Sequence, residues 1–264
     1  MSTSFKYLHE LQDKRVLIFG GSSGFGFAVA EAAIEHGAQV ILSGSSQDKL
    51  NIAVSRLKGQ YPDAKSSQFT SLACDLAKLD SLDTRLENLL SNATNGGANK
   101  IDHIVYTADN SHPAPTVDKT TVEDVDLSLR LRAFSASILA KVIASTDYLS
   151  RSSGSSVTFT NGDSGHRPVK GWAIPAMGST ALEGLVRGLA VDLAPIRVNL
   201  VSAGPVATDM LLSLPKDILD MYAEQTVLKA LGTPEDIAEA YLYIMKDRYI
   251  TGTILFSDGG RRIA

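Results

Sequence analysis

Residues 16–26, with the sequence VLIFGGSSGFG, decide the fold of this chain. The apolar run at 16–19 is typical of a buried parallel strand, and glycines follow it at positions 20, 21, 24 and 26. Residues 27–36 predict a helix that ends at Gly37, and residues 39–43 predict a second strand. Such a turn lets a ligand approach the backbone, and the helix N-terminus offers free N–H groups to a phosphate. We therefore expect a dinucleotide site; the alternative is a merely tight strand-to-helix turn.

Composition excludes several classes of protein. The chain has 264 residues, of which 44% are hydrophobic and 20% charged, as in an ordinary globular protein with a sizeable core. A net charge of −4 gives no reason to expect nucleic acid or a membrane surface as partner. The polar N-terminus lacks the apolar core of a signal peptide, so we expect a cytoplasmic location. The single Cys74 excludes an internal disulfide, and the five histidines lack metal-ligand spacing, so we expect no metal.

Strand and helix signals alternate along the chain, which predicts one α/β domain over residues 1–264. We expect a doubly wound parallel sheet of about seven strands with helices on both faces. Residues 91–100 are polar and predict a surface loop, and residues 121–149 predict a long helix that one break could interrupt. Residues 204–232 lack periodicity but are rich in leucine and methionine, so we expect a lid over the substrate.

The chain resembles the short-chain dehydrogenase/reductase superfamily over nearly its whole length. The resemblance is carried by GGSSGFG at 20–26, by Asp75 after the third predicted strand, by LAPIRVNLVSAGPVATDM at 193–210 and by ITGTILFSDGG at 250–260. It implies a Rossmann fold, a homo-oligomer formed through the long helices, and a bound dinucleotide with its adenine at Asp75. The residues expected to bind the cofactor are Gly20, Ser22, Ser23, Gly24, Phe25, Gly26, Ser45, Ser46, Lys49, Asp75, Ala108, Gly204, Pro205, Val206 and Thr208.

The end of the second strand bears on which dinucleotide binds. An acid there would bind the ribose hydroxyls of NAD and repel the 2′-phosphate of NADP. This chain instead has Ser-Gly-Ser-Ser at 43–46, followed by Lys49 one turn into the next helix. Two hydroxyls and a nearby cation suit a phosphate, although the arginine usual in the family is missing. We therefore expect NADP(H); the alternative is that the serines only cap the next helix.

The catalytic positions of the family are changed in this chain. Most members reduce carbonyls with a serine, a tyrosine that donates the proton, and a lysine that lowers the pKa of that tyrosine. These positions fall at Gly162, Pro175 and Ser179, and Arg130 stands where the family has an asparagine. All four catalytic positions are therefore lost, while the cofactor half is kept.

Three functions remain open. The chain could be a catalytically silent NADP-binding pseudoenzyme, or a carbonyl reductase in which Tyr106, Asp163 or His166 replaces the proton donor. The third is reduction of an iminium ion, which accepts hydride without a proton and is stabilised by a nearby carboxylate. Asp163, beside the lost serine position, supplies that carboxylate.

The same pattern resembles the fungal bifunctional reductase/Diels–Alderases of malbrancheamide and paraherquamide biosynthesis. The resemblance implies NADPH reduction of a prenylated, cationic pyrazinone, then an intramolecular [4+2] cycloaddition to an indole alkaloid. Arg130 and Asp163 match the working residues of that group by position. The alternatives are that Arg130 only forms an ion pair with Asp126 or Asp163, and that Asp163 is a turn residue.

Four apolar residues are candidates for contact with the substrate. Trp172, the only tryptophan, lies in a loop expected to border the substrate, where an indole could stack on it. Met210, Leu211 and Leu212 belong to the expected lid. The alternatives are that the tryptophan merely plugs the loop and that the lid residues merely cover the core.

Overall fold

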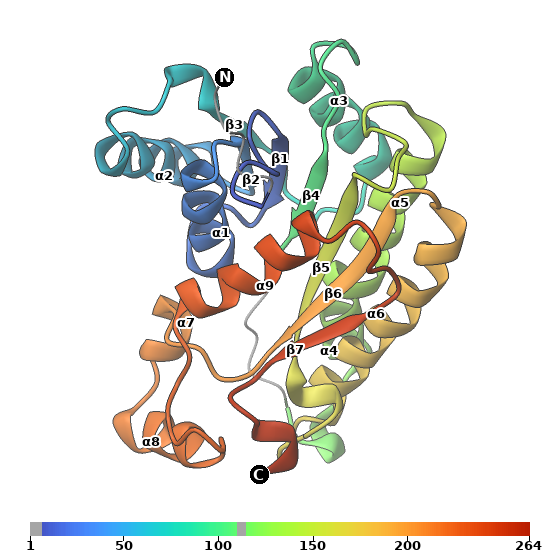
Figure 1. Ribbon diagram of the computed structural model, residues 1–264. Coiled ribbons are helices and arrows are strands. Elements are labelled where there is room, and N and C mark those ends of the chain that lie inside the picture. The colour runs from blue at the N-terminus through green and yellow to red at the C-terminus, as the bar shows by residue number, and fades with distance from the viewer. Residues whose placement is uncertain (1–6, 110–114) are drawn as a thin grey trace.

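The structure is a computed structural model that describes residues 7–109 and 115–264. Its centre is a sheet of seven parallel strands in the order β3-β2-β1-β4-β5-β6-β7 (Figure 1). The strands are β1 (Arg15–Phe19), β2 (Gln39–Gly44), β3 (Phe69–Ala73), β4 (His103–Tyr106), β5 (Ser156–Gly162), β6 (Arg197–Ala203) and β7 (Ile254–Ser257). The doubly wound α/β fold and the seven strands predicted from the sequence are confirmed.

Helices connect the strands on both faces of the sheet. They are α1 (Gly24–Glu35), α2 (Gln47–Gln60), α3 (Leu82–Thr94), α4 (Val122–Leu129), α5 (Ala136–Ser145), α6 (Ala173–Asp192), α7 (Asp209–Leu212), α8 (Lys216–Glu224) and α9 (Pro234–Lys246). Within residues 7–109 and 115–264, none of these helices is long and apolar enough to cross a membrane.

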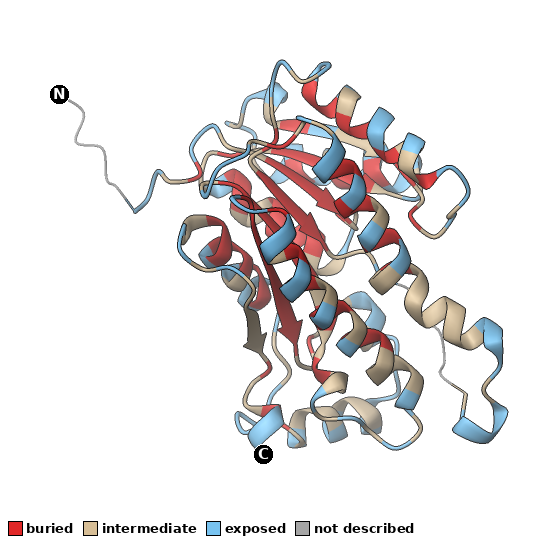
Figure 2. Cartoon of the chain, turned by 90° about the vertical axis from the view of Figure 1, so that its right-hand side faces the viewer, coloured by how far each residue is buried: buried red, intermediate tan, exposed pale blue. Residues whose placement is uncertain are grey.

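Two hydrophobic cores lie on the two faces of the sheet. Strand β1 contributes to both, because its side chains alternate: Val16 and Ile18 pack with α1, α2 and α9, whereas Leu17 and Phe19 pack with α3, α5 and α6. Figure 2 shows the consequence, with the central strands buried along most of their length and many helices buried on one side only. Burial on both faces is the reason why β1 is a continuous apolar run.

The sequence predicted most elements but misplaced some of their ends. The polar stretch 91–100 begins inside a helix, because α3 continues to Thr94, whose hydroxyl donates to the carbonyl of Leu90 at 2.7 Å. The lid region 204–232 contains the short helices α7 and α8. Neither helix buries a residue, and α7 is a single turn that is too short to show apolar periodicity. In α8, Ile218, Leu219 and Tyr222 are spaced for one helix face, a pattern that the sequence analysis missed.

The long helix expected at 121–149 is interrupted by a π-helical segment at Arg130–Ser135. The Ser135 hydroxyl lies 2.8 Å from the carbonyl oxygen of Arg130 and 2.6 Å from that of Leu76, and its single proton is donated to one of them or shared between them. The Tyr106 hydroxyl donates to the carbonyl of Leu131 at 2.9 Å. These side chains satisfy backbone carbonyl groups at the interruption. Segments of this kind are frequent at functional sites.

All seven strands end at the same edge of the sheet because all are parallel. The strand order reverses direction between β1 and β4, since β2 and β3 follow on one side and β5 to β7 on the other. In open parallel sheets, ligands bind at the carboxyl ends of the strands beside such a reversal. The fold therefore points to the loops after β1 and β4 as the centre of a binding site.

A buried histidine in β4 predicts how stability depends on pH. His103 is 1% exposed, and its Nδ1 lies 2.9 Å from the Ser156 hydroxyl. Burial lowers the pKa of His103 to about 3, although Asp102 partly opposes this. The unfolded chain titrates near pH 6.5, so between pH 6.5 and 3 only the unfolded state takes up the proton. This histidine should therefore reduce the free energy of unfolding by about 1.4 kcal/mol for each pH unit below 6.5.

Chemical denaturation at several pH values between 7 and 5 measures this dependence. His103→Gln should flatten it, whereas His9→Gln, which changes an exposed histidine, should leave it as in the wild type. An unchanged pH dependence in His103→Gln would contradict the assignment.

Candidate active site

The glycine-rich turn after β1 is packed too tightly for side chains. Gly20 has φ +81°, and a Cβ atom built on it would lie 2.7 Å from Thr107 Oγ1. A Cβ atom on Gly26 would lie 2.4 Å from the carbonyl oxygen of Gly20. These glycines let the turn, the start of α1 and the loop after β4 approach one another closely.

The N-terminus of α1 is free to bind an anion. The helix begins at Gly24, and its first turn carries no acidic residue. The Ser23 side chain does not cap it within the described residues. Backbone N–H groups and the positive end of the helix dipole therefore face the carboxyl edge of the sheet, which fits the pyrophosphate of a dinucleotide.

The predicted cofactor residues gather along this one edge. They follow β1 (Gly20, Ser22, Ser23, Gly24, Phe25 and Gly26), β2 (Ser45, Ser46 and Lys49), β3 (Asp75), β4 (Ala108) and β6 (Gly204, Pro205, Val206 and Thr208). The far ends of the row also approach each other, since a Cβ atom on Gly24 would lie 3.6 Å from Thr208 Cγ2.

At the end of β2, capping and phosphate binding are both compatible with the geometry. Ser46 Oγ accepts from the backbone N–H of Lys49 at 3.4 Å, so Ser46 caps α2 as the alternative interpretation required. The side chains of Ser45 and Lys49 remain exposed at the same helix end. Asp48, in the first turn of α2, adds a negative charge there that would weaken a phosphate site.

A cavity lies at the other end of the predicted cofactor row. It has a volume of about 370 Å³ and is lined by residues that follow β6 and β7, including Gly204, Pro205 and Asp258. A Cβ atom on Gly204 would lie 2.6 Å from the Cα of Asp258, so the two loops are pressed together beside the cavity.

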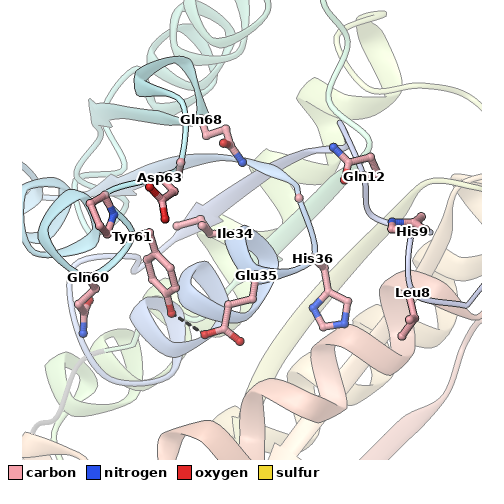
Figure 3. Close-up of a pocket in the computed structure, with 13 residues that line it drawn as sticks. Leu8, His9, Gln12, Ile34, Glu35, His36, Gln60, Tyr61, Asp63 and Gln68 are labelled. Atoms are coloured by element: carbon pink, nitrogen blue, oxygen red, sulfur yellow. Dashed lines mark hydrogen bonds between the residues drawn. The ribbon is translucent and has the colours of Figure 1, made fainter. Parts of the chain in front are cut away.

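A larger cavity of about 660 Å³ lies at the opposite edge of the sheet (Figure 3). Its lining comes from segments that precede β1, β2 and β3, among them His9, His36 and Gln68. The Tyr61 hydroxyl donates to Glu35 Oε1 at 2.7 Å within it. None of the predicted site residues lines this cavity, so it is separate from the candidate active site.

The positions of the family's catalytic residues hold no tyrosine or lysine in this structure. Pro175 and Ser179 both lie in α6, and Gly162 ends β5. Ser179 is buried, and its Oγ lies 3.1 Å from Ser164 Oγ. A small hydroxyl therefore occupies the place of the ammonium group that would lower the pKa of a proton donor.

Two candidate substitute proton donors are engaged elsewhere. The Tyr106 hydroxyl is buried and donates to the Leu131 carbonyl. Burial raises the pKa of Tyr106 far above its ordinary value, which opposes proton release. His166 Nε2 lies 2.9 Å and 3.0 Å from the two carboxylate oxygens of the buried Glu183, and its ring packs edge-on against Phe256. Tyr106 is thus excluded as an accessible donor by its position.

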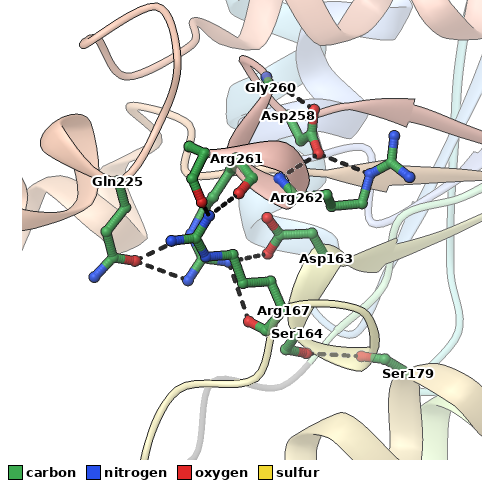
Figure 4. A network of polar contacts seen from close by, with 10 residues as sticks. Asp163, Ser164, Arg167, Ser179, Gln225, Asp258, Gly260, Arg261 and Arg262 are labelled. Atoms are coloured by element: carbon green, nitrogen blue, oxygen red, sulfur yellow. Dashed lines mark hydrogen bonds and ion pairs between the residues drawn. The ribbon is translucent and has the colours of Figure 1, made fainter.

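Asp163 lies in a short 3-10 turn (Asp163–Gly165) directly after β5 and is only 6% exposed. Its Oδ1 accepts from Arg261 Nη1 at 2.7 Å (Figure 4). Its Oδ2 is also buried and has no hydrogen-bond partner among the residues that the structure describes. Burial raises the pKa of Asp163, and the charge and hydrogen bond of Arg261 oppose the increase.

Arg130 does not contact Asp163 in this structure. Its guanidinium pairs with Asp126 one turn earlier and approaches Glu123 at 4.0 Å. Of the two ion pairs that the sequence left open, the structure therefore forms the one with Asp126. Arg130 Nε is buried and has no partner within residues 7–109 and 115–264, so one donor of this side chain is unused.

The candidate substrate-binding residues are exposed rather than packed into the core. Trp172 is 42% exposed, Met210 56% and Leu212 52%, whereas Leu211 is half-buried. No residue of α7 or α8 is buried, so the lid residues do not form part of the core. Trp172 precedes α6, which packs against α4 through a hydrogen bond from the Ser128 hydroxyl to the Ile174 carbonyl at 3.0 Å.

Sequence reasoning missed the partner of Asp163. Arg261 stands 98 positions away along the chain, after the stretch that carries the family resemblance. A buried carboxylate requires a nearby cation, which is the only signal that the sequence offered. Three arginines follow Asp163 closely or end the chain (Arg167, Arg261 and Arg262), and no pattern in the sequence distinguishes them.

Comparisons with known proteins agree with this geometry. A family model described as an SDR-like Rossmann domain matches residues 7–263. The short-chain dehydrogenase/reductase MalC of Malbranchea aurantiaca is 40% identical over 255 residues, which are 95% of each chain. The short-chain dehydrogenase/reductase UcsE of an Acremonium species is 39% identical over 260 residues, or 97% of each chain.

Solved structures show the same relationship. The structure of the MalC reductase/Diels–Alderase from Malbranchea aurantiaca superposes with a TM-score of 0.89, at 39% identity, over 98% of this chain and 99% of that one. A short-chain dehydrogenase/reductase from Serratia marcescens superposes with a TM-score of 0.82, at 26% identity, over 96% of this chain and all of that one. The chain therefore belongs to the short-chain dehydrogenase/reductase family.

Proposed function

We propose that this protein is an NADPH-dependent reductase of a cationic iminium or pyrazinone substrate. In the same proposal it then steers an intramolecular Diels–Alder cycloaddition in the biosynthesis of a prenylated indole alkaloid. The observation that carries the proposal is the state of Asp163: a buried carboxylate with one oxygen held by Arg261 and the other without a partner in the described part of the chain. The similarity to the MalC reductase/Diels–Alderase supports it.

The chemistry of an iminium explains why the proton donors are dispensable. Reduced nicotinamide, when bound, supplies a hydride, which forms a C–H bond at the iminium carbon. The electron pair of the C=N π bond moves to nitrogen, and the product is a neutral amine that needs no proton. The lack of a tyrosine at Pro175 and of a lysine at Ser179 then does not prevent the reaction.

Asp163 holds the cation for this step. A substrate cation bound to Oδ2 lies closer to this oxygen than to the guanidinium of Arg261, which contacts the other oxygen. The attraction of the cation to the carboxylate therefore exceeds its repulsion by Arg261. Arg130 has an unused buried donor, Nε, with which it can bind a carbonyl oxygen of the substrate. In this proposal Asp163 binds the cationic centre of the substrate and Arg130 binds a carbonyl oxygen.

The cycloaddition would require no acid or base, only a substrate folded with its diene over its dienophile. The exposed apolar side chains of Trp172, Met210 and Leu212, together with Leu211, offer walls that can favour one folded conformation. Closure of the lid would strengthen this preference, since it would bury more apolar surface of the folded substrate against these walls.

A carbonyl reductase that uses Asp163 as its acid is the second candidate, because burial raises the pKa of this group. The two functions predict opposite effects of pH. An iminium reductase needs ionised Asp163, so kcat/KM falls as the pH falls through the pKa of Asp163. A carbonyl reductase needs protonated Asp163, so kcat/KM falls as the pH rises through that pKa.

The exposed Ser45 and Lys49 predict a cofactor preference. NADPH should bind at least tenfold more tightly than NADH, which is a difference of about 1.4 kcal/mol in binding free energy. A fluorescence titration with each cofactor measures the two affinities. Lys49→Gln should reduce this preference by removing the cation. Lys58→Gln, at the other end of α2, is the matched control and should leave it unchanged. Equal affinities of the wild type for the two cofactors would contradict the expectation.

The buried Tyr106 should not be needed for catalysis. Tyr106→Phe removes a hydroxyl that donates to the Leu131 carbonyl, so a stability loss of about 1 kcal/mol is expected. Most of the reductase activity should remain in steady-state assays. A loss of roughly a thousandfold, as expected for a missing general acid, would favour the carbonyl-reductase function instead.

Asp163 and Trp172 should affect different steps. Asp163→Asn keeps the shape of the side chain but deletes its charge, so turnover should fall on the order of 10²-fold. Trp172→Ala should mainly scramble the stereochemistry of the cycloadduct. Product analysis by chiral chromatography, with a prenylated Trp-Pro-type iminium and NADPH, measures both effects.

Two results would overturn these assignments. If the wild type yields the same isomer mixture as a chemical reductant without protein, the cycloaddition is not steered. If Asp163→Asn reduces the substrate as fast as the wild type does, the iminium argument fails. Retained NADPH binding by both variants is the control for correct folding.

A further inference from the structure

Arg261 makes a set of contacts that spans two parts of the site (Figure 4). Arg261 is buried, with 3% of the residue exposed. Its Nη1 donates to Asp163 Oδ1 at 2.7 Å and to the Arg167 carbonyl at 3.3 Å. Its Nε and Nη2 donate to Gln225 Oε1 at 3.2 Å and 2.9 Å. Gln225 directly follows α8, so one side chain joins the candidate catalytic carboxylate to the lid.

Other charges surround Asp163, but they have different partners. Asp258, after β7, carries a like charge and pairs with Arg262 at 2.9 Å. Arg167 donates to the carbonyls of Arg261 and Ala264. On the side of α6, His166 and Glu183 pair with each other. Within the part of the chain that the structure describes, Arg261 is the one cation that forms an ion pair with Asp163.

We propose that Arg261 is a positioning residue that keeps Asp163 ionised, orients its free oxygen and couples it to the lid through Gln225. The importance of this arrangement for reduction rests on the proposed function of Asp163. The effect of Arg261 on the charge of Asp163 does not, because it follows from the contact alone.

The direction of the effect follows from the two opposing influences on Asp163. Burial and the nearby negative charge of Asp258 raise the pKa of Asp163, whereas Arg261 lowers it through its hydrogen bond and its charge. An opposite charge in contact changes a pKa by about one to three units. Removing Arg261 therefore leaves only the weaker influence of the Arg167 charge to oppose burial, and the carboxyl group takes up a proton at a higher pH.

The lid takes part because the free oxygen is not accessible. Asp163 Oδ2 is buried in this structure, so a substrate reaches it only after a neighbouring segment moves. Gln225 connects Arg261 to α8 by two hydrogen bonds, neither of which involves Asp163. Movement of α8 can thus break the contacts to Gln225 while the ion pair between Arg261 and Asp163 persists.

The pKa of Asp163 can be measured without a substrate. Protein labelled with [4-¹³C]aspartate is titrated by NMR, and the resonance of Asp163 is assigned by its absence in Asp163→Asn. In Arg261→Gln the pKa of Asp163 should rise by about one unit or more. Arg261→Lys keeps the charge, so the pKa should stay close to the wild-type value. Arg151→Gln removes an arginine that contacts the carbonyls at the end of α5 and beyond it, and should leave the pKa in place.

Kinetics with a probe substrate provides the second readout. N-methyl-3,4-dihydroisoquinolinium, a cyclic iminium, is reduced with NADPH over a range of pH. The acidic limb of the kcat/KM profile should move to higher pH in Arg261→Gln, in parallel with the NMR titration, and should stay in place in Arg261→Lys. Gln225→Ala should change KM without moving the acidic limb, because the ion pair of Asp163 is intact.

The outcomes separate this proposal from the proposed function. The proposal about Arg261 is overturned if the pKa of Asp163 is unchanged in folded Arg261→Gln. It is also overturned if this pKa is raised in Arg261→Lys. If the glutamine variant does not fold, the lysine variant alone provides the test. A raised pKa in Arg261→Gln in a protein that reduces no iminium supports the role of Arg261 and contradicts only the proposed function. A purely structural role would lower thermal stability in both Arg261 variants and leave the titration of Asp163 unchanged.

Discussion

The carbonyl oxygen of Gly20 lies only 2.4 Å from the place that a Cβ atom on Gly26 would occupy, and this close approach organises the rest of the site. It allows α1 to start immediately above the end of β1 and directs the free N–H groups of the helix along the carboxyl edge of the sheet. It also presses the turn against Thr107, which follows β4 at the reversal of the strand order. Because every strand is parallel, the residues after β5, β6 and β7 reach the same edge, and the candidate cofactor and substrate residues are brought together.

Much of the fold could be predicted because its signals are local. The apolar run of β1 indicates burial on both faces, and the glycines that follow it indicate a close turn. Both signals lie within a dozen residues of sequence. The helix α7 is a single turn and has no such signal, whereas α8 carries apolar residues at helical spacing that were not recognised inside a stretch expected to be a lid. One break in the helix over 121–149 was expected, but its place at Arg130–Ser135 was not, because there Ser135 contacts the carbonyl of Leu76, which lies 59 positions earlier.

The sequence predicts a site residue only where a reactive residue type stands at a position that the fold itself fixes. Asp163 could be singled out because it follows β5 beside the family's serine position. Its partner could not, since the ion pair with Arg261 is formed by two loops from distant parts of the chain and depends on how closely they pack. The fold thus keeps the architecture of its family, and the proposed function depends on the charges at one edge rather than on the fold.

The π-helical segment at Arg130–Ser135 has a consequence for how this protein can change. An α-helix rotates by about 100° for each residue, and a π-helical turn holds roughly one residue more than an α-helical turn. The segment therefore sets α4, which carries the residues before Arg130, out of phase with α5, whose Leu139 and Val142 are packed in the core. Deletion of one residue here would give a continuous helix. In that helix, Arg130 and the core side chains Leu139 and Val142 could not all keep their present neighbours. Insertions and deletions at this point thus act as a rotation of one half of the helix, and related chains can turn different side chains toward the active-site edge without altering the sheet.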